Sequence, residues 1–135
     1  MRLVLSIPLF LYLLVAANVL MLTPHASGSW LNVVLGEIML PSQREMVLTV
    51  SDLLIVMGVL SLYIETLKAT RTSIVSIVDH GLSLLVFVFF LIELLVVPEV
   101  GNTTFLILAV CSLMDVVMGF TVTISTARRD LAVGL

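Results

Sequence analysis

Four runs of mostly apolar residues, each about as long as a membrane-spanning helix, constrain this chain more than any other feature. They cover residues 3–22, 46–67, 73–97 and 103–125. A bilayer core about 30 Å thick takes about 20 residues of helix to cross. Hydrophobic residues make up 61% of the 135, whereas a soluble domain has about half. The sequence therefore predicts an all-α fold in which residues 1–135 form a single membrane domain, an integral four-helix bundle.

The first run also has some features of a secretory signal peptide. Arg2 precedes it, and Ala16-Ala17-Asn18 resembles a weak cleavage context. The run is about 20 residues long, however, where the apolar part of a signal peptide has about 7–15. We therefore expect residues 3–22 to form the first membrane helix.

The basic residues are distributed unevenly between the two sides of such a bundle. If the N-terminus is cytoplasmic, only Arg44 falls on the opposite side. The positive-inside rule places basic residues in cytoplasmic segments. The sequence thus predicts a multi-pass protein of a bacterial inner (cytoplasmic) membrane with both termini cytoplasmic. The basic residues assigned to the cytoplasmic side are Arg2, Lys68, Arg71, Arg128 and Arg129.

Residues 29–40, between the first two runs, are too few to cross a bilayer but carry an apolar stripe. Ser29 is a suitable helix N-cap and Pro41 a suitable stop. Trp30 is typical of the boundary between lipid and water. The pattern predicts a short amphipathic interfacial helix over about 29–40, anchored by Trp30 on the outer side of the membrane. Its apolar face would consist of Leu31, Val34, Leu35 and Ile38.

Small and polar residues recur at helical spacing in the last three runs. Such faces let membrane helices approach closely and bond to one another. They predict a bundle with a partly polar interior and an apolar exterior. The faces comprise Ser51, Gly58, Ser61, Glu65 and Lys68 in the second run, Ser76, Asp79, Ser83 and Glu93 in the third, and Ser112, Asp115, Gly119, Thr123 and Thr126 in the fourth.

Asp115 is the most informative of these residues because of its depth. It lies about 12 residues into the fourth run, roughly 18 Å at 1.5 Å per residue. An Asp at the centre of a membrane helix costs about 2.5–3.5 kcal/mol on insertion scales. Such acids often move protons or cations, but a protonated Asp bonded to Ser112 or to another helix would serve assembly. The sequence leaves both interpretations open.

The other ionisable residues in the runs have simpler explanations. Asp79 and His80 are adjacent, which favours a hydrogen-bonded structural pair over a proton relay. Glu65 is followed three residues later by a lysine, which predicts an ion pair. Asp52 and Glu93 lie near the outer ends of their runs, where their carboxylates can reach the headgroups.

The sequence contains no motif for enzymatic chemistry. There is no Gly-rich phosphate loop, no G-x-S-x-G and no metal-spaced Cys/His set. A haem held by two histidines needs both at a similar depth, whereas His25 and His80 fall on opposite sides. The single Cys111 excludes a disulfide within the chain, and no basic cluster is large enough for nucleic acid. We expect neither enzymatic activity, nor a cofactor, nor a metal, nor a nucleic-acid partner.

Some of these features occur in the order typical of one family of small membrane proteins. An acid precedes a basic helix end in Leu62-Tyr-Ile-Glu65-Thr-Leu-Lys68-Ala, Asp79 lies early in the next helix, and the final helix ends in Arg128-Arg129. Over residues 60–129, about half the chain, the sequence resembles the PsiE-like (phosphate-starvation-inducible) family. That family often has a basic residue late in the third helix, where this chain has Glu93. The resemblance implies a four-helix membrane fold without an established activity.

Two functions fit this sequence. The first is a non-enzymatic membrane protein that assembles through its polar helix faces, as a homo-oligomer or as an accessory subunit of a larger membrane complex. The alternative is an oligomer that conducts protons or cations along a ladder of Asp52, Asp115 and the Asp79/His80 pair. The expected partners are the lipid bilayer and other membrane subunits or further copies of the chain.

Overall fold

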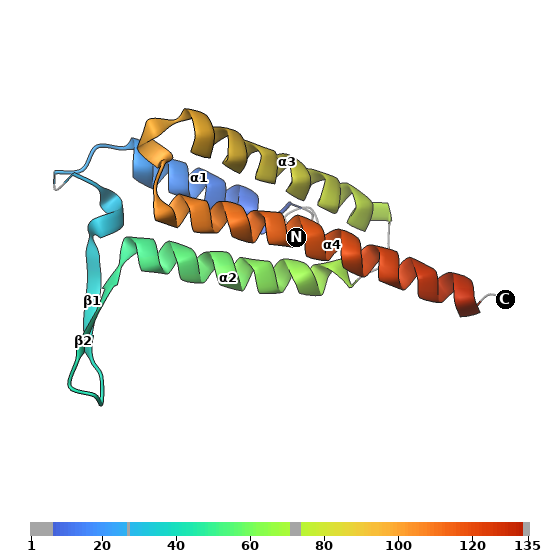
Figure 1. Cartoon of the computed structure of the whole chain (residues 1–135), viewed down its shortest axis with the longest axis horizontal. Coiled ribbons are helices and arrows are strands. Elements are labelled where there is room, and N and C mark those ends of the chain that lie inside the picture. The colour runs from blue at the N-terminus through green and yellow to red at the C-terminus, as the bar shows by residue number, and fades with distance from the viewer. Residues whose placement is uncertain (1–6, 27, 71–73, 134–135) are drawn as a thin grey trace.

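The computed structural model describes residues 7–26, 28–70 and 74–133, and the side chains of 74–77, 126, 127 and 129–133 lie outside that description. The chain is mostly helical, as predicted, and also contains one small sheet (Figure 1). Helices α1 (Leu9–Leu22), α2 (Val50–Ala69), α3 (Ile74–Val96) and α4 (Thr103–Val133) form a bundle. Strands β1 (Val34–Met39) and β2 (Glu45–Thr49) form a hairpin between α1 and α2. Two short 3₁₀ helices, η2 (Trp30–Asn32) and η3 (Pro98–Val100), precede β1 and α4.

Among the described residues, three helical segments are long and apolar enough to cross a membrane. They are Val50–Ala69, Val78–Val96 and Thr103–Ser125, while Leu9–Leu22 is a shorter apolar helix. Figure 1 shows the four helices lying alongside one another, with the hairpin at one end of the bundle and the last turns of α4 extending beyond the other. We call these ends the hairpin end and the Lys68 end.

The prediction of an interfacial helix over 29–40 is wrong. Ser29 does cap a helix, because its Oγ accepts a hydrogen bond from the Leu31 N–H, but that helix is the 3₁₀ turn η2, which ends at Asn32. A strand follows instead, since Val33, Val34 and Ile38 are β-branched and Gly36 weakens a helix. The apolar stripe fitted a helix, but a partner strand was available in residues 45–49.

A three-residue turn closes the hairpin. The Leu40 carbonyl accepts from the Gln43 N–H at 2.9 Å, and the Leu40 N–H donates to the Arg44 carbonyl at 2.9 Å. Pro41 suits the second position of this turn, and Gln43 is left-handed at φ 60°, as in a type I turn followed by a G1-type bulge. Beyond the turn, Met39 pairs with Glu45, Ile38 with Met46, Glu37 with Val47 and Gly36 with Leu48.

Helix α2 begins at Val50 and not at residue 46, because a capping box fixes its start. The Asp52 N–H donates to Thr49 Oγ1 at 3.4 Å, and the Thr49 N–H donates to Asp52 Oδ2 at 2.9 Å. Each side chain thereby satisfies a backbone donor at the first turn. Asp52 is thus a helix cap, and its sequence signal was the Thr49-x-x-Asp52 spacing before an apolar run.

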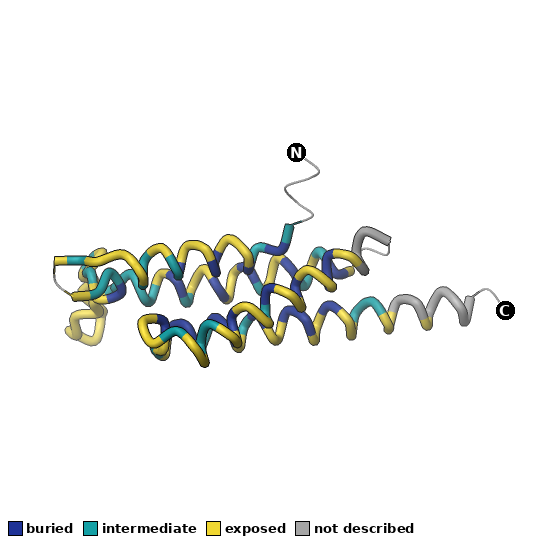
Figure 2. Tube along the Cα trace, turned by 90° about the horizontal axis from the view of Figure 1, so that it is seen from above, coloured by how far each residue is buried: buried dark blue, intermediate teal, exposed yellow. Residues whose placement is uncertain are grey.

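The interior of the bundle has two parts, and Figure 2 shows the exposed residues on its outside. Towards the hairpin end the interior is apolar, and the rings of Phe90 and Phe105 pack there with centroids 5.2 Å apart. Gly58 lets α2 approach α4 closely, because a Cβ on it would lie 2.8 Å from Leu108. We call this part the apolar layer; it comprises Leu54, Val86, Phe90, Phe105, Leu108 and Ala109, all buried.

Candidate functional site: a buried polar cluster

Towards the Lys68 end, the interior of the bundle is polar. Most described residues of the predicted polar faces of α2, α3 and α4 meet there and point inward, while the side chains of Ser76 and Thr126 lie outside the described part of the chain. Most of these side chains are buried, although they include three carboxyl groups. We call this set the polar cluster; it comprises Ser61, Glu65 and Lys68 on α2, Asp79, His80 and Ser83 on α3, and Ser112, Asp115 and Thr123 on α4.

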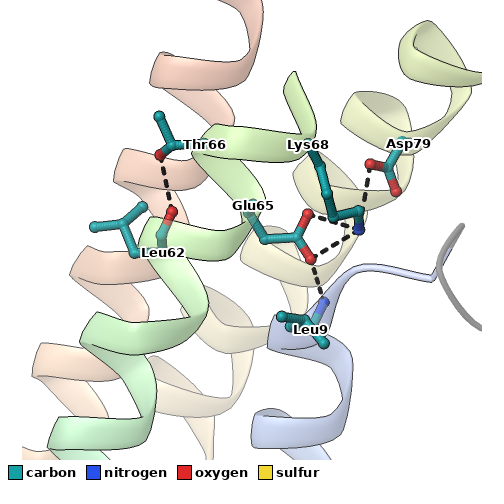
Figure 3. Close-up of polar contacts among 6 residues, drawn as sticks. All are labelled: Leu9, Leu62, Glu65, Thr66, Lys68 and Asp79. Atoms are coloured by element: carbon teal, nitrogen blue, oxygen red, sulfur yellow. Dashed lines mark hydrogen bonds and ion pairs between the residues drawn. The ribbon is translucent and has the colours of Figure 1, made fainter. Parts of the chain in front are cut away.

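Glu65 is the residue through which the polar cluster reaches a fourth helix. It is 3% exposed, and its carboxylate contacts the Lys68 ammonium at 2.8 Å from Oε2 and 3.1 Å from Oε1, the ion pair predicted from their spacing. Oε1 also accepts a hydrogen bond from the backbone N–H of Leu9 at 2.6 Å (Figure 3). The residue before α1 is Pro8, which makes no side-chain cap. Glu65 therefore caps α1 from another helix and places a negative charge at its positive end.

Lys68 carries the charge network on to α3. Its ammonium lies 3.6 Å from Asp79 Oδ2, so that one cation stands between the carboxylates of Glu65 and Asp79 (Figure 3). The Lys68 side chain is 17% exposed, which keeps part of the ammonium hydrated. Breaking a buried ion pair by removing one member costs about 3–5 kcal/mol. The network thus ties α1, α2 and α3 together at one point.

His80 joins α3 to α4. Its Nε2 lies 2.9 Å from Thr123 Oγ1, and its ring packs at 5.8 Å, centroid to centroid, from that of Phe120. The neighbouring Asp79 contacts Lys68 on α2. The two adjacent residues therefore bind different helices, as expected for side chains about 100° apart around α3.

Asp115 is a buried acid of the polar cluster on α4. It is 5% exposed, the Ser83 hydroxyl acts on it as a hydrogen-bond donor, and the charges of Glu65, Asp79 and Lys68 reach it. Within the described part of the chain, Asp115 Oδ2, Ser112 Oγ and Asp79 Oδ1 are buried without a hydrogen-bond partner. A buried polar atom left unpaired costs about 1–3 kcal/mol. The cluster therefore binds helices together and also retains capacity to bind a further polar group.

Three other predicted residues lie away from the polar cluster. Asp52 is the α2 cap. Glu93 Oε2 accepts from Asn18 Nδ2 at 2.6 Å and so joins α3 to α1. Trp30 is half-buried, with its ring centroid 4.1 Å from that of His25, and its indole N–H is buried without a partner. The structure brings together Glu65, Asp79, His80 and Asp115, and it does not bring Asp52, Glu93 or Trp30 to them.

The apolar layer interrupts the ladder of acids along the bundle. Asp52 lies at the hairpin end of α2, on the far side of the layer from Asp115. Phe90, Phe105 and Leu108 are fully buried between these two levels. A charge crossing this layer would lose its water without gaining a polar partner, which costs several kcal/mol or more. Within the described part of one chain, the apolar layer therefore separates the polar cluster from the hairpin end.

Two contacts that join α1 to the other helices could not be read from the sequence. The Leu9 contribution is a backbone N–H, which any residue other than proline would supply. Asn18 is visible only as a polar interruption of the first apolar run. Among the residues that the structure describes, no group of three or more His, Cys, Asp or Glu side chains is placed to hold a metal ion.

Comparison with known proteins gave no relative of this chain. No protein-family model matches it, and neither a curated protein nor a solved structure matches it. The resemblance to the PsiE-like family stays a prediction. What the structure itself defines is a mostly helical chain with three helices apolar enough for a membrane and a charged, buried cluster between them.

Proposed function

We propose that this chain is a non-enzymatic integral membrane protein that acts by assembly, with itself or as an accessory subunit of a larger complex. In this proposal the helices cross a bacterial inner membrane, the Lys68 end is cytoplasmic and the hairpin is periplasmic. The apolar exterior supports insertion: Leu53, Val56, Val59, Leu85 and Leu95 are each at least half exposed. The uneven distribution of basic residues supports the orientation.

The observation that carries assembly is the exposed hairpin. Its strands run sideways from the bundle, and the turn lies well clear of the helices (Figure 1). Large apolar side chains cover it without a partner in the described chain, among them Met39 at 63% exposure and Leu35 at 54%. Contiguous exposed apolar surface of this kind marks an interaction site. The polar helix faces are occupied by one another, so we assign assembly chiefly to the hairpin.

A second candidate is a proton- or cation-conducting oligomer. It is favoured by the excess of acid in the polar cluster, where three carboxyl groups face one ammonium and several oxygens have no partner. An ionisable residue inside a membrane helix is by default a hypothesis for a functional site. The apolar layer opposes conduction through one chain, so a pathway would have to form between copies.

The mass of the solubilised assembly tests the proposal. The protein is extracted from its own membranes in mild detergent, and its mass and components are determined by native mass spectrometry. Assembly predicts a complex heavier than one chain, whereas a lone chain at all protein concentrations contradicts it. Proton and cation flux in reconstituted vesicles separates the candidates, because an assembly subunit gives no more flux than empty vesicles.

A further inference from the structure

The hairpin is a two-stranded sheet with both of its edges open. Only β1 and β2 pair in the described chain, so each strand has one edge whose backbone groups are unpaired. Neither face is covered, since every residue of β1 and β2 is exposed or half-buried. A two-stranded hairpin alone is at best marginally stable in water, and further strands or a packed face are needed. The open edges and uncovered faces of the hairpin are therefore available to a binding partner.

The two edges are not equivalent. Strand β1 is interrupted by a bulge between Val34 and Gly36 and carries Glu37 at its centre. Bulges and mid-strand charges are the features that prevent edge pairing. Strand β2 is regular, and its central residues Met46, Val47 and Leu48 are all apolar. The edge open to a further strand is that of β2.

The ladder shows which β2 residues face that edge. Leu40 and Arg44 form a hydrogen-bonded pair next to the turn, and such pairs alternate along an antiparallel ribbon. Glu45 and Val47, which lie opposite Met39 and Glu37, therefore direct their backbone N–H and C=O groups away from β1. These groups are the ones that a third strand would bond.

The direction of the hairpin points to a second copy. Copies in one membrane share one orientation, so a two-fold axis between them runs parallel to the helices. The strands lie across the helices (Figure 1). Rotation about an axis perpendicular to a strand reverses that strand, so the β2 strands of two copies would meet antiparallel. Lipid could cover an apolar face of the ribbon, but it supplies no such ladder of backbone donors and acceptors.

We propose that β2 pairs antiparallel with β2 of a second copy around Val47, giving a four-stranded sheet over the hairpin end. The proposal rests on the proposed function, because it names the partner and the surface of that assembly. A six-residue strand spans about 20 Å, about two helix diameters of about 10 Å, so each hairpin reaches over the neighbouring bundle. One face of the sheet would carry Ile38, Met46 and Leu48, and the other Glu37, Met39, Glu45 and Val47.

Cysteine cross-linking in native membranes tests the pairing. In a Cys111→Ala background, Val47→Cys is compared with Ile38→Cys, since the two native side chains are similarly exposed at 45% and 47%. Opposite residues in a hydrogen-bonded antiparallel pair lie about 5.5 Å apart, whereas the two β1 strands would be about three strand spacings, roughly 14 Å, apart. A thiol cross-linker shorter than about 10 Å should give a dimer with Val47→Cys and not with Ile38→Cys.

A proline variant provides a second measurement that leaves the hairpin intact. Val47→Pro removes an N–H that points away from β1, so it should block the new edge without breaking the β1–β2 ladder. Its control is Glu37→Pro, which makes the same change opposite it on β1. The mass of the detergent-solubilised assembly should fall to that of one chain, or of one chain with its other partners, for Val47→Pro alone.

The outcomes separate this proposal from the proposed function. A heavy complex with other components and no Val47 cross-link overturns self-pairing and leaves assembly standing. A lone chain without cross-link overturns both. Equal cross-linking at residues 38 and 47, or labelling of Val47→Cys by a lipid-phase reagent in place of cross-linking, also overturns the pairing, the latter in favour of a hairpin lying on lipid.

Discussion

The imidazole of His80 occupies the space that a side chain at Gly119 would need. A Cβ built on Gly119 would lie 2.6 Å from His80 Nδ1, closer than packed atoms come. The glycine thus lets α3 and α4 approach where His80 bonds Thr123. This contact positions one wall of the polar cluster.

Gly119→Ala should therefore destabilise the protein. Overpacking a well-packed interior costs about 1–3 kcal/mol, and here the obstacle is a ring held by a hydrogen bond. The measurement is thermal or denaturant unfolding in detergent. Gly81→Ala is the control, because a Cβ there meets nothing within 4 Å and alanine favours a helix by about 1 kcal/mol. An equal loss of stability in Gly119→Ala and Gly81→Ala would contradict the packing explanation. Adding His80→Ala to Gly119→Ala should restore part of the lost stability.

Glu65→Leu should cost about 3 kcal/mol of unfolding free energy, because it removes the anion from a buried network and leaves Lys68 and the Leu9 N–H without it. Glu65→Gln should cost less, since its amide oxygen still accepts both hydrogen bonds. Adding Lys68→Met to Glu65→Leu should not restore the loss, because Asp79 would then be buried without its counter-ion. If Glu65→Leu unfolds like the native protein, the network does not hold the helices together.

Thr49→Ala should weaken the start of α2 by about 1 kcal/mol, the usual value for a lost N-cap. The effect should be local, so amide hydrogen exchange ought to rise in residues 49–53 and not at the Lys68 end of the helix. Thr66→Ala is a matched control, because the Thr66 hydroxyl bonds the Leu62 carbonyl inside the same helix at 2.8 Å. If amide exchange in the first turn of α2 is unchanged in Thr49→Ala, the capping box does not determine where α2 begins.

Asp115 separates the two proposed functions. Asp115→Asn keeps an acceptor for Ser83 and adds a donor for an unpaired neighbour, so stability should be equal or higher. Asp115→Leu should cost about 1 kcal/mol per lost interhelical bond. For an assembly subunit, neither variant changes flux in vesicles. A native flux that Asp115→Asn abolishes, with the assembly intact, would favour the conducting oligomer instead.

Reporter fusions test the orientation. Fusions after residues 71 and 129 should read cytoplasmic, and a fusion at Gly28 periplasmic, because all basic residues but Arg44 then lie on the cytoplasmic side. A periplasmic signal at residue 129 would invert the bundle and place the hairpin in the cytoplasm.

The residues that line the interior of the bundle could be predicted from the sequence because they recur at helical spacing. Small and polar residues at helical spacing identified the faces that carry Gly58, Glu65, Asp79 and Asp115, and these faces do turn inward. The repeat shows which side of a helix is polar, but it does not show which other helix packs against that side. The hydrogen bond that Asn18 donates to Glu93 depends on how α1 is placed along α3. The spacing of residues within either helix gives no information on that placement.

The hairpin was missed because residues 29–40 satisfy two patterns at once. Leu31, Val34, Leu35 and Ile38 form a helical stripe, yet the same stretch is rich in β-branched residues. The helical stripe was outweighed by this strand propensity together with a partner strand in residues 45–49, which the apolar pattern had assigned to the second membrane helix. The Thr49-x-x-Asp52 capping signal marked the true boundary between strand and helix.

The bond between Glu65 and Leu9 also bears on the order in which the molecule is completed. The acceptor is synthesised 56 residues after the donor, so the start of α1 waits uncapped during translation until α2 has emerged. Lys68 must also follow before the charge on Glu65 is balanced. The first helix to be made is thus capped at its start only after α2 has been made, and an intact cap on α1 reports that α1 and α2 have come together.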